Sequence, residues 1–242
     1  MATFVMIHGA WHGGWCFDTL RPLLEAKGHQ MIAPDLPGMG GSEAELAAVT
    51  LGGWADYVAA IVRDADAPVI LCGHSRGGVV ISETAERVPE KMAALVYICA
   101  MLLPSGMSRE EMRKVNDPNP DFNAIRSNVP GGTVIDKSMA VPIFAQLSPP
   151  DLAAAAAARL VAEPAKPMGT MLALTEARYG SVPRHYIECL HDRTIPISDQ
   201  RRMQTLQPCA SVTSLAADHS PFLSTPTELA GALIAVAEGL TP

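Results

Sequence analysis

The stretch Pro68-Val-Ile-Leu-Cys-Gly-His-Ser-Arg-Gly77 decides the fold prediction. Its first half, Pro68–Cys72, is a short apolar run of the kind that forms a buried strand. A Gly-x-Ser-x-Gly pentapeptide, Gly73–Gly77, follows at once, and the residues after it are compatible with a helix. In such a strand–turn–helix the backbone reverses sharply and leaves the serine hydroxyl exposed at the end of the strand. The stretch therefore predicts Ser75 as an exposed nucleophile.

Apolar runs and amphipathic segments alternate on either side of this stretch, which predicts a mostly parallel sheet with helices on both faces. Gly28 is expected to end the first helix at its C′ position. The segment Thr225–Glu228 is expected to open the last helix, with Thr225 as N-cap, Pro226 at the first position and Glu228 at the third. Strands are predicted at 3–8, 30–34, 68–73, 94–100, 184–190 and 211–216, and helices near 17–27, 52–66, 76–87, 198–207 and 226–239.

The alternation stops between residues 104 and 181, where turn-forming clusters stand at 117–120, 130–132 and 148–150. Ser148-Pro-Pro-Asp151 has the composition of a helix start ahead of the alanine run 153–158. We predict a mainly helical lid at 104–181, inserted into an α/β core formed by 1–103 and 182–242. Six methionines from Met101 to Met171, together with three aromatic residues, are expected to pack a small core of the lid; the alternative is that some of them line an apolar pocket over Ser75. The three aromatic residues are Phe122, Phe144 and Tyr179.

Composition limits the class of protein. A length of 242 residues favours one large α/β domain. A hydrophobic content of 48% supplies a core, and 18% charged residues is too few for a disordered chain. The formal net charge of −7 argues against a nucleic-acid partner.

The cysteines and the first residues bear on the compartment. The five cysteines are odd in number and lack C-x-x-C spacing, and Cys72, Cys99 and Cys189 lie in or beside apolar runs. Buried free thiols in a reducing compartment are therefore expected. Met1–His8 has no basic region ahead of its apolar residues, and no apolar stretch reaches about 20 residues. We predict a cytoplasmic protein with no signal peptide and no membrane span.

A serine hydroxyl needs a base to take its proton, and a carboxylate to orient that base. His219 stands in the polar loop 216–221, directly after the last predicted strand, and Asp192 follows the predicted strand 184–190. Loops at the carboxyl ends of parallel strands gather at one edge of the sheet. Ser75, His219 and Asp192 are therefore predicted to meet as a catalytic triad, in the chain order typical of α/β-hydrolases.

Other aspartates fit the orienting role less well. Asp199 is expected to be exposed at a helix start, and Asp35 is expected to support a turn or cap. Asp218 is adjacent to His219 in the chain and is poorly placed to reach the ring of its own neighbour.

Acyl transfer also needs donors for the developing oxyanion. The backbone N–H of Arg76, directly after the nucleophile, and that of Ala10, in the glycine-rich loop His8–Trp15, are the predicted pair. His8 and His12 lack a third ligand for a metal, and no G-x-G-x-x-G spacing is present. No metal and no cofactor are expected.

Five segments together resemble the α/β-hydrolase superfamily, and within it the branch of plant methyl esterases, hydroxynitrile lyases and related bacterial carboxylesterases. They span the core from the first strand to the last loop, whereas the insertion matches only in position and size. The resemblance implies the same triad and the same two oxyanion donors. The segments are His8-Gly-Ala-Trp-His-Gly-Gly-Trp15, Ala33-Pro-Asp-Leu-Pro-Gly-Met-Gly-Gly-Ser42, Gly73-His-Ser-Arg-Gly-Gly78, Asp192-Arg-Thr-Ile-Pro196 and Asp218-His219.

Three positions bear on the branch. Hydroxynitrile lyases of this family carry threonine after the first-strand histidine and lysine after the catalytic histidine, where this chain has Gly9 and Ser220. Hydroxynitrile lyase activity is therefore disfavoured. Esterases of the branch usually carry a hydrophobic residue after the elbow serine, whereas this chain has Arg76, which we expect to join a structural salt bridge rather than point toward the pocket mouth.

These observations predict a serine carboxylesterase that hydrolyses small to medium hydrophobic esters, aromatic ones included, through an acyl-enzyme. Gly9, Trp11, Met101, Phe144 and Ser220 are the expected substrate-binding residues. A lactonase, a C–C hydrolase or a perhydrolase with the same triad, and a slow or non-catalytic ligand-binding receptor on a hydrolase scaffold, remain alternatives. The expected partner is a small-molecule ester, and homodimerisation is left open.

Overall fold

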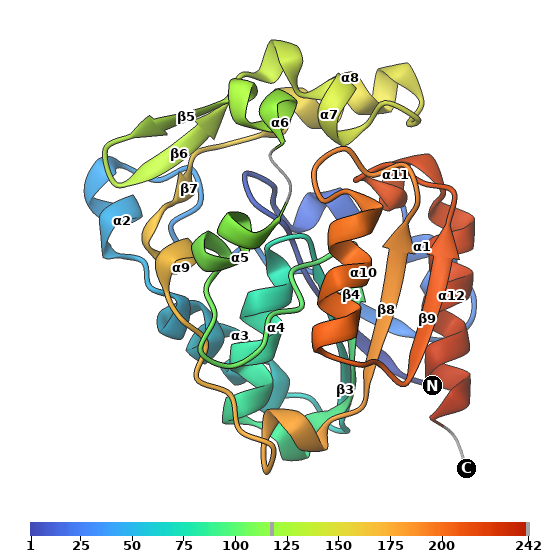
Figure 1. The fold of residues 1–242 in the computed structure, drawn as a ribbon. Helices are drawn as coiled ribbons and strands as arrows, with labels where there is room; N and C mark the ends of the chain where they lie inside the picture. Colours follow the sequence, from blue (N-terminus) through green and yellow to red (C-terminus); the bar gives the residue numbers. More distant parts are fainter. Residues whose placement is uncertain (117–118, 241–242) are drawn as a thin grey trace.

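A parallel sheet forms the centre of the computed structural model, which describes residues 1–116 and 119–240 (Figure 1). Within these residues the sheet has six strands in the order β2-β1-β3-β4-β8-β9, and every pair is parallel. The predicted α/β-hydrolase fold is confirmed. The strands are β1 (Thr3–Ile7), β2 (Gln30–Ile32), β3 (Val69–His74), β4 (Met92–Ile98), β8 (Arg184–Cys189) and β9 (Ser211–Leu215).

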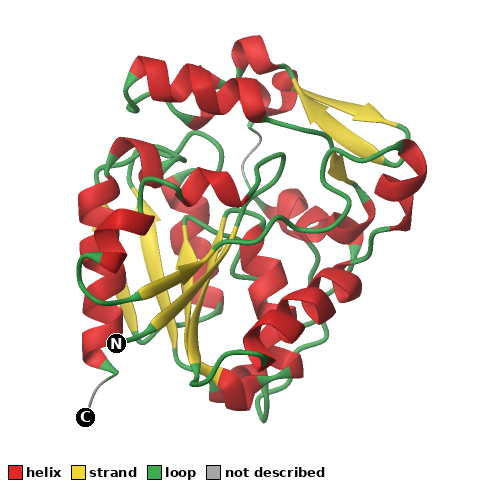
Figure 2. Cartoon of the chain, turned by 180° about the vertical axis from the view of Figure 1, so that it is seen from behind, coloured by secondary structure: helices red, strands yellow, loops and turns green. Residues whose placement is uncertain are grey.

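Helices cover both faces of this sheet (Figure 2). Alternate residues of a strand point to opposite faces, so Val5 and Ile7 of β1 pack under α3, α4 and α10, whereas Phe4 and Met6 pack under α1 and α12. Both faces are therefore buried, as is usual for parallel sheets. The helices outside the insertion are α1 (Arg21–Glu25), α2 (Glu43–Ala48), α3 (Leu51–Arg63), α4 (Gly77–Arg87), α10 (Ile197–Leu206), α11 (Pro221–Ser224) and α12 (Pro226–Gly239), with short 3-10 turns at Gly14–Phe17 and Pro89–Lys91.

The predicted helix ends were partly right. Gly28 has φ +77°, the left-handed conformation typical of a C′ glycine, but Ala26 is the C-cap of α1, so Gly28 lies one residue beyond the predicted C′ position. Pro226 opens α12 as predicted. Thr225, however, makes no side-chain bond to the first turn of α12, and its hydroxyl donates to the carbonyl of Pro221 in the preceding short helix α11. The predicted positions of Thr225, Pro226 and Glu228 are therefore confirmed, but the Thr225 side chain makes no capping bond because its hydroxyl is taken up by α11.

The chain between β4 and β8 contains helices and a second sheet that the sequence did not predict. This sheet is antiparallel, has three strands in the described part of the chain, and packs beside α2 (Figures 1 and 2). The alanine run forms α8, as expected from Ser148–Asp151, while two residues of the turn cluster 117–120 lie outside the described residues. The elements are α5 (Arg109–Val115), α6 (Pro120–Ile125), β5 (Arg126–Val129), β6 (Gly132–Ile135), α7 (Val141–Phe144), α8 (Pro150–Arg159), β7 (Glu163–Pro164) and α9 (Lys166–Gly169), with 3-10 turns at Lys137–Met139 and Tyr179–Ser181.

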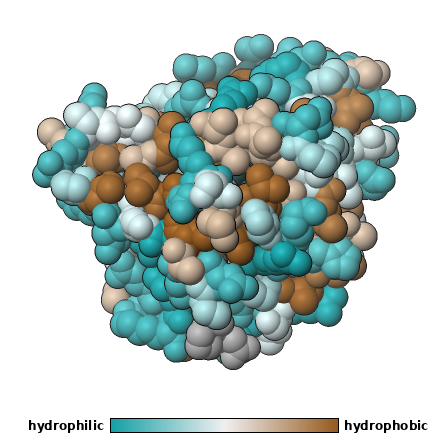
Figure 3. Space-filling view, turned by 90° about the horizontal axis from the view of Figure 1, so that it is seen from above, coloured by the Kyte–Doolittle hydropathy of each residue, from teal (hydrophilic) through white to brown (hydrophobic). Residues whose placement is uncertain are grey.

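The methionines of this region do not form a core of their own. Met112 and Met168 belong to the main core beneath, and Met107 packs against it. The cluster inside the insertion is built instead from aromatic and aliphatic residues around Trp11, Phe122 and Phe144. Seen from above, hydrophobic side chains interrupt the polar surface (Figure 3). Met139 and Met171 are exposed.

The state of the cysteines and the length of the helices are both relevant to the predictions from the sequence. All five cysteines of the described chain are free, and four of them are buried. None of the helices in the described ranges is long and apolar enough to cross a membrane.

Gly77 allows the start of α4 to pack directly against the end of β1. A Cβ built on Gly77 would lie 2.4 Å from the carbonyl oxygen of Ile7, which is backbone and cannot move aside. The start of α4 therefore approaches the end of β1 as closely as backbone contact allows, and this fixes the turn that carries Ser75.

We expect Gly77→Ala to lower the free energy of unfolding by at least about 2 kcal/mol, because the methyl group overpacks this contact. Gly231→Ala is the matched control, since its Cβ would meet nothing within 4 Å in the middle of α12. There, alanine should be neutral or stabilise by up to about 1 kcal/mol. Urea unfolding of the two variants measures the difference, and equal midpoints would contradict the close contact.

Candidate active site

Ser75 lies in the sharp turn between β3 and α4. Its φ is +52°, in the left-handed region that non-glycine residues rarely adopt. Two backbone hydrogen bonds hold it there: its N–H donates to the carbonyl of Ile98 (3.2 Å), and its carbonyl accepts from the N–H of Met101 (2.9 Å). The turn is therefore fastened to the end of the neighbouring strand β4, and the serine side chain has a fixed direction.

The three residues predicted as a triad are hydrogen-bonded in series. His219 Nε2 lies 3.0 Å from Ser75 Oγ, and His219 Nδ1 lies 2.7 Å from Asp192 Oδ2. All three side chains are buried. A carboxylate has no proton to give, so Nδ1 is the donor to Asp192 and Nε2 is left to accept from the serine hydroxyl. The loops after β8 and β9 thus bring together residues that lie 144 and 27 positions apart in the chain.

The carboxylate of Asp192 is held on both oxygens. Oδ1 accepts from the backbone N–H groups of Thr194 (2.7 Å) and Ile195 (2.9 Å). Gln200, fully buried on α10, donates to Oδ2 (3.4 Å) and to the carbonyls of Cys189 and Ile195. These bonds tie the loop to the helix that follows it, so Asp192 keeps the orientation that His219 needs. Sequence reasoning missed Gln200, because a glutamine on a predicted helix carries no local signal of burial.

His74 supports His219 from the strand side. Its Nε2 donates to the backbone carbonyl of His219 (2.7 Å), and the two rings lie 4.7 Å apart. Burial, with the nearby His219 adding to it, holds the pKa of His74 well below its usual value. Gly9 packs against this histidine: a Cβ there would lie 2.8 Å from His74 Nδ1 and 2.9 Å from Ser75 Cβ. No side chain fits at position 9.

Asp218 joins the loop of His219 to the insertion. Its Oδ2 accepts from the N–H of Leu147 (2.8 Å) and the hydroxyl of Ser148 (3.1 Å), and its Oδ1 accepts from Ser220 N–H and the Ser224 hydroxyl. It orients backbone rather than the His219 ring, which agrees with setting it aside as the triad acid. Asp35 accepts from Gly14 N–H (2.7 Å) and so supports a turn as expected. Asp199 was expected to be exposed, and this was wrong: it is buried at the start of α10.

The side chain of Arg76 turns away from the solvent into a buried ion pair. Its Nε lies 3.3 Å from Glu163 Oε2, its guanidinium carbon lies 4.2 Å from the Trp54 ring centre, and its Nη2 donates to the carbonyl of Gly9 (2.8 Å). Burial lowers the pKa of Arg76 to about 10, against the opposing effect of Glu163. The structural salt bridge expected for Arg76 is therefore present.

The predicted oxyanion donors lie on the same cavity as the serine. Ala10, Ser75 and Arg76 all line it, and Arg76 is the residue from which α4 begins. The loop that carries Ala10 is held through Trp11, whose indole N–H donates to the carbonyl and hydroxyl of Thr133.

Two of the predicted substrate-binding residues, Trp11 and Met101, line this cavity, and Gly9 does not. Phe144 and Ser220 line a separate small cavity against α8 instead, although the Phe144 ring is 5.9 Å from that of His219. Phe144 belongs to α7, which packs against α8, and this packing places its ring on the second cavity. Phe122 lines the cavity too, so with Met101 it fits the alternative in which some of the methionine and aromatic residues line a pocket over Ser75. Three further residues of the cavity come from segments that no local pattern connects: Arg109, Thr194 and Ile195.

His74, Cys99 and His219 form the one group in the described ranges whose ligand atoms lie close enough to hold a metal ion. Nε2 of each histidine is engaged, with the His219 carbonyl and with Ser75 respectively. These nitrogen atoms are therefore already used by the hydrogen bonds of the serine site.

Comparison with known proteins agrees with this geometry. A family model described as the alpha/beta hydrolase family matches residues 4–232. The chain belongs to this family. It is 35% identical to a pyrethroid hydrolase of Sphingobium wenxiniae, over 95% of this chain and 85% of that protein.

Plant relatives are similar over nearly the whole chain. Salicylic acid-binding protein 2 of Nicotiana tabacum is 30% identical, with 97% of this chain and 96% of that protein covered. Putative methylesterase 11 of Arabidopsis thaliana, a chloroplastic protein, is 32% identical over 97% of this chain and 63% of its own length. The crystal structure of a pyrethroid hydrolase from Sphingobium faniae superposes with a TM-score of 0.86 at 32% identity, covering 98% of this chain and 97% of that one.

Two buried histidines near the site make stability depend on pH. Burial lowers the pKa of His8 to about 3 and of His12 to about 4, from 6.5. His8 is held neutral, since its Nε2 accepts from Leu36 N–H (3.0 Å) and its Nδ1 donates to the Gly9 carbonyl (2.8 Å). Below pH 6.5 the unfolded chain therefore binds protons that the folded chain does not.

We expect the free energy of unfolding to be highest above about pH 6.5 and to fall as the pH drops toward about 4. Each of the two histidines contributes a loss of up to about 1.4 kcal/mol per pH unit. Urea unfolding at about pH 7.5 and about pH 5.5 measures it. His8→Gln should lower stability at the higher pH and reduce the slope. Identical wild-type midpoints at the two pH values would contradict the lowered pKa values of these histidines.

Proposed function

We propose that this protein is a serine carboxylesterase that acts through an acyl-enzyme on small to medium hydrophobic esters. The observation that carries the proposal is the hydrogen-bonded series from Ser75 through His219 to Asp192, at 3.0 and 2.7 Å. The names of two relatives, a pyrethroid hydrolase and a methylesterase, agree with hydrolysis of esters.

In the proposed reaction, Ser75 Oγ attacks the ester carbonyl while His219 Nε2 takes the hydroxyl proton. Asp192 stabilises the imidazolium that forms. The backbone N–H groups of Ala10 and Arg76 stabilise the oxyanion of the tetrahedral intermediate. His219 then gives its proton to the departing alcohol. A water molecule, deprotonated by the same ring, attacks the acyl-enzyme and releases the acid, which restores the serine.

The cavity favours apolar groups next to the reacting carbon. Trp11, Met101, Phe122 and Ile195 line it beside Ser75. We propose that residues 104–181 act as a lid that supplies part of this wall, since Arg109 and Phe122 come from α5 and α6. The buried free thiols support a reducing compartment, and the cytoplasm is proposed.

A second candidate is a ligand-binding receptor that hydrolyses slowly. It is favoured by one relative, which is named a salicylic acid-binding protein. Cyanohydrin cleavage is disfavoured because there is no room for a side chain at position 9. The threonine that lyases of the branch carry there would overlap His74 and Ser75.

The test is the rate at which wild type and Ser75→Ala hydrolyse a panel of methyl and aryl esters, with lactones and a β-diketone included. We expect brisk ester hydrolysis by wild type and a loss of at least about a thousandfold in kcat for Ser75→Ala. Ser127→Ala, an exposed serine on β5, is the matched control and should act as wild type. Wild-type rates in Ser75→Ala would contradict the proposal, and slow turnover with tight binding would favour the receptor.

A further inference from the structure

Arg109 is a buried arginine that has no anionic partner among the residues that the structure describes. It begins α5 and is 8% exposed, yet it makes no hydrogen bond and no ion pair with any residue in 1–116 or 119–240. Its nearest described interaction is with an aromatic ring, since the guanidinium carbon lies 6.0 Å from the centre of Phe122. Arg76, the other buried arginine of the site, is paired with Glu163. A buried guanidinium is costly unless a negative group compensates it.

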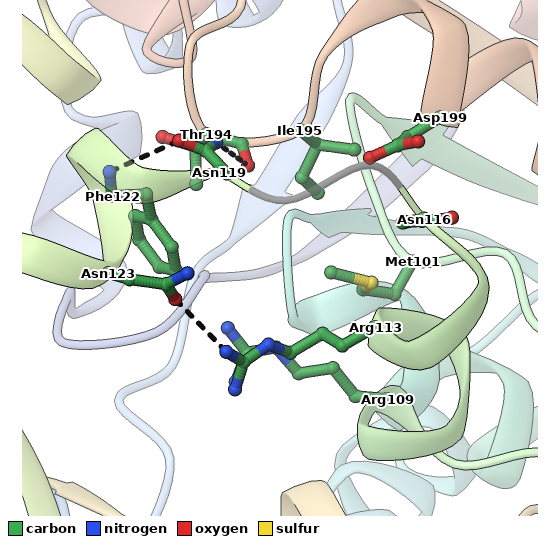
Figure 4. A pocket seen from close by; sticks show the side chains of 10 residues that line it. All are labelled: Met101, Arg109, Arg113, Asn116, Asn119, Phe122, Asn123, Thr194, Ile195 and Asp199. Atoms are coloured by element: carbon green, nitrogen blue, oxygen red, sulfur yellow. Dashed lines mark hydrogen bonds between the residues drawn. The ribbon is translucent and has the colours of Figure 1, made fainter.

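The unpaired guanidinium belongs to the wall of the serine cavity. Arg109 lines both that cavity and a larger one that adjoins it, and the two share Met101, Phe122, Thr194 and Ile195. The two cavities are therefore neighbours on either side of these residues, and Ser75 lines the smaller one. Figure 4 shows the guanidinium groups of Arg109 and Arg113 close together in the larger one. Arg113 donates to the side-chain oxygen of Asn123 (3.0 Å).

Among the described residues that line the two cavities, Arg76, Arg109 and Arg113 are positively charged and Asp199 is the one carboxylate. Glu163 is a buried carboxylate whose charge acts on Arg109, and the same carboxylate also compensates Arg76 and the half-buried Arg126. Burial lowers the pKa of Arg109 to about 10, and the neighbouring Arg126 and Arg113 lower it further, while Glu163 and Glu110 oppose this. Asp199 lines the larger cavity but lies at the other end of it from the arginines (Figure 4). A positive pocket in a chain of net charge −7 is suited to attract an anion.

We propose that the preferred substrates are esters that carry a second, anionic group, a carboxylate, which pairs with the guanidinium of Arg109 while the ester carbonyl lies at Ser75. Monoesters of dicarboxylic acids are the simplest members of this class. The inference rests on the proposed esterase function and changes its substrate from a wholly hydrophobic ester to one that carries a carboxylate at the end remote from the ester. An arginine presents parallel N–H donors to a carboxylate, so the pair also fixes which end of the molecule reaches the serine.

The first test uses wild-type protein. The kcat/KM values for monomethyl succinate, glutarate, adipate and pimelate are compared with those of the neutral methyl esters in which an isopropyl group replaces the carboxylate. A charge-assisted bond to a buried group predicts a ratio of about ten to a hundred in favour of the best monoester. If the neutral esters are hydrolysed as fast as every monoester, or faster, the inference is overturned and the esterase proposal stands.

The second test removes the charge. In Arg109→Met, an unbranched apolar side chain keeps the contact with Phe122, and the ratio is expected to fall to about one. Arg109→Lys keeps the charge and should keep part of the ratio. This variant provides the test if Arg109→Met does not fold. Arg63→Met is the matched control, because it removes one positive charge at the exposed end of α3. An unchanged ratio in Arg109→Met would overturn the inference.

A binding measurement tests the role of Arg109 independently of whether the protein hydrolyses esters. In Ser75→Ala, calorimetry should detect the best monoester and should lose the signal when Arg109→Met is added. If no ester is hydrolysed by wild type, the esterase proposal fails, whereas this binding result still decides whether Arg109 receives the carboxylate. Absence of binding to Ser75→Ala overturns the inference.

Discussion

The left-handed backbone of Ser75 is the constraint on which the rest of the site depends. A non-glycine residue at φ +52° is strained and persists only where the surroundings enforce it. Here β1 and β4 flank β3, Gly77 lies against the carbonyl of Ile7, and β4 accepts the Ser75 N–H. The central position of β3 therefore fixes the serine before any side chain of the triad contributes. The hydroxyl that results points toward the loops after β8 and β9.

Buried polar groups behind the triad hold these loops in place. His74 binds the carbonyl of His219, Gln200 binds Asp192, and Asp218 binds both the His219 loop and the insertion. Each of these bonds joins groups that are buried away from water, where an unsatisfied donor or acceptor costs free energy. The same logic makes Arg109 conspicuous, since it is buried beside the serine and forms no ion pair within the described part of the chain. A substrate that brings its own carboxylate would complete a set of polar contacts that is elsewhere satisfied by the chain.

The core of the site could be predicted from sequence because its signals are local. Ser75 sits between a strand run and a helix run, and Asp192 and His219 each follow a strand, so parallel topology alone brings them to one edge. What could not be predicted depends on contacts between distant segments. The burial of Asp199, the separate cavity of Phe144, the part played by Gln200 and the small sheet β5–β7 all arise from how the insertion and α10 pack. Arg109 looked like one charged residue in an irregular stretch, and only its burial beside Ser75 distinguishes it.

The most direct measurement of the central claim is the site of covalent modification by an alkyl fluorophosphonate, which reacts with activated serine nucleophiles. Intact-mass and peptide mass spectrometry should show a single adduct on Ser75, formed in step with the loss of ester hydrolysis and absent in Ser75→Ala. An adduct on a different residue that tracks the loss of activity, or full inactivation with Ser75 unmodified, would contradict the account.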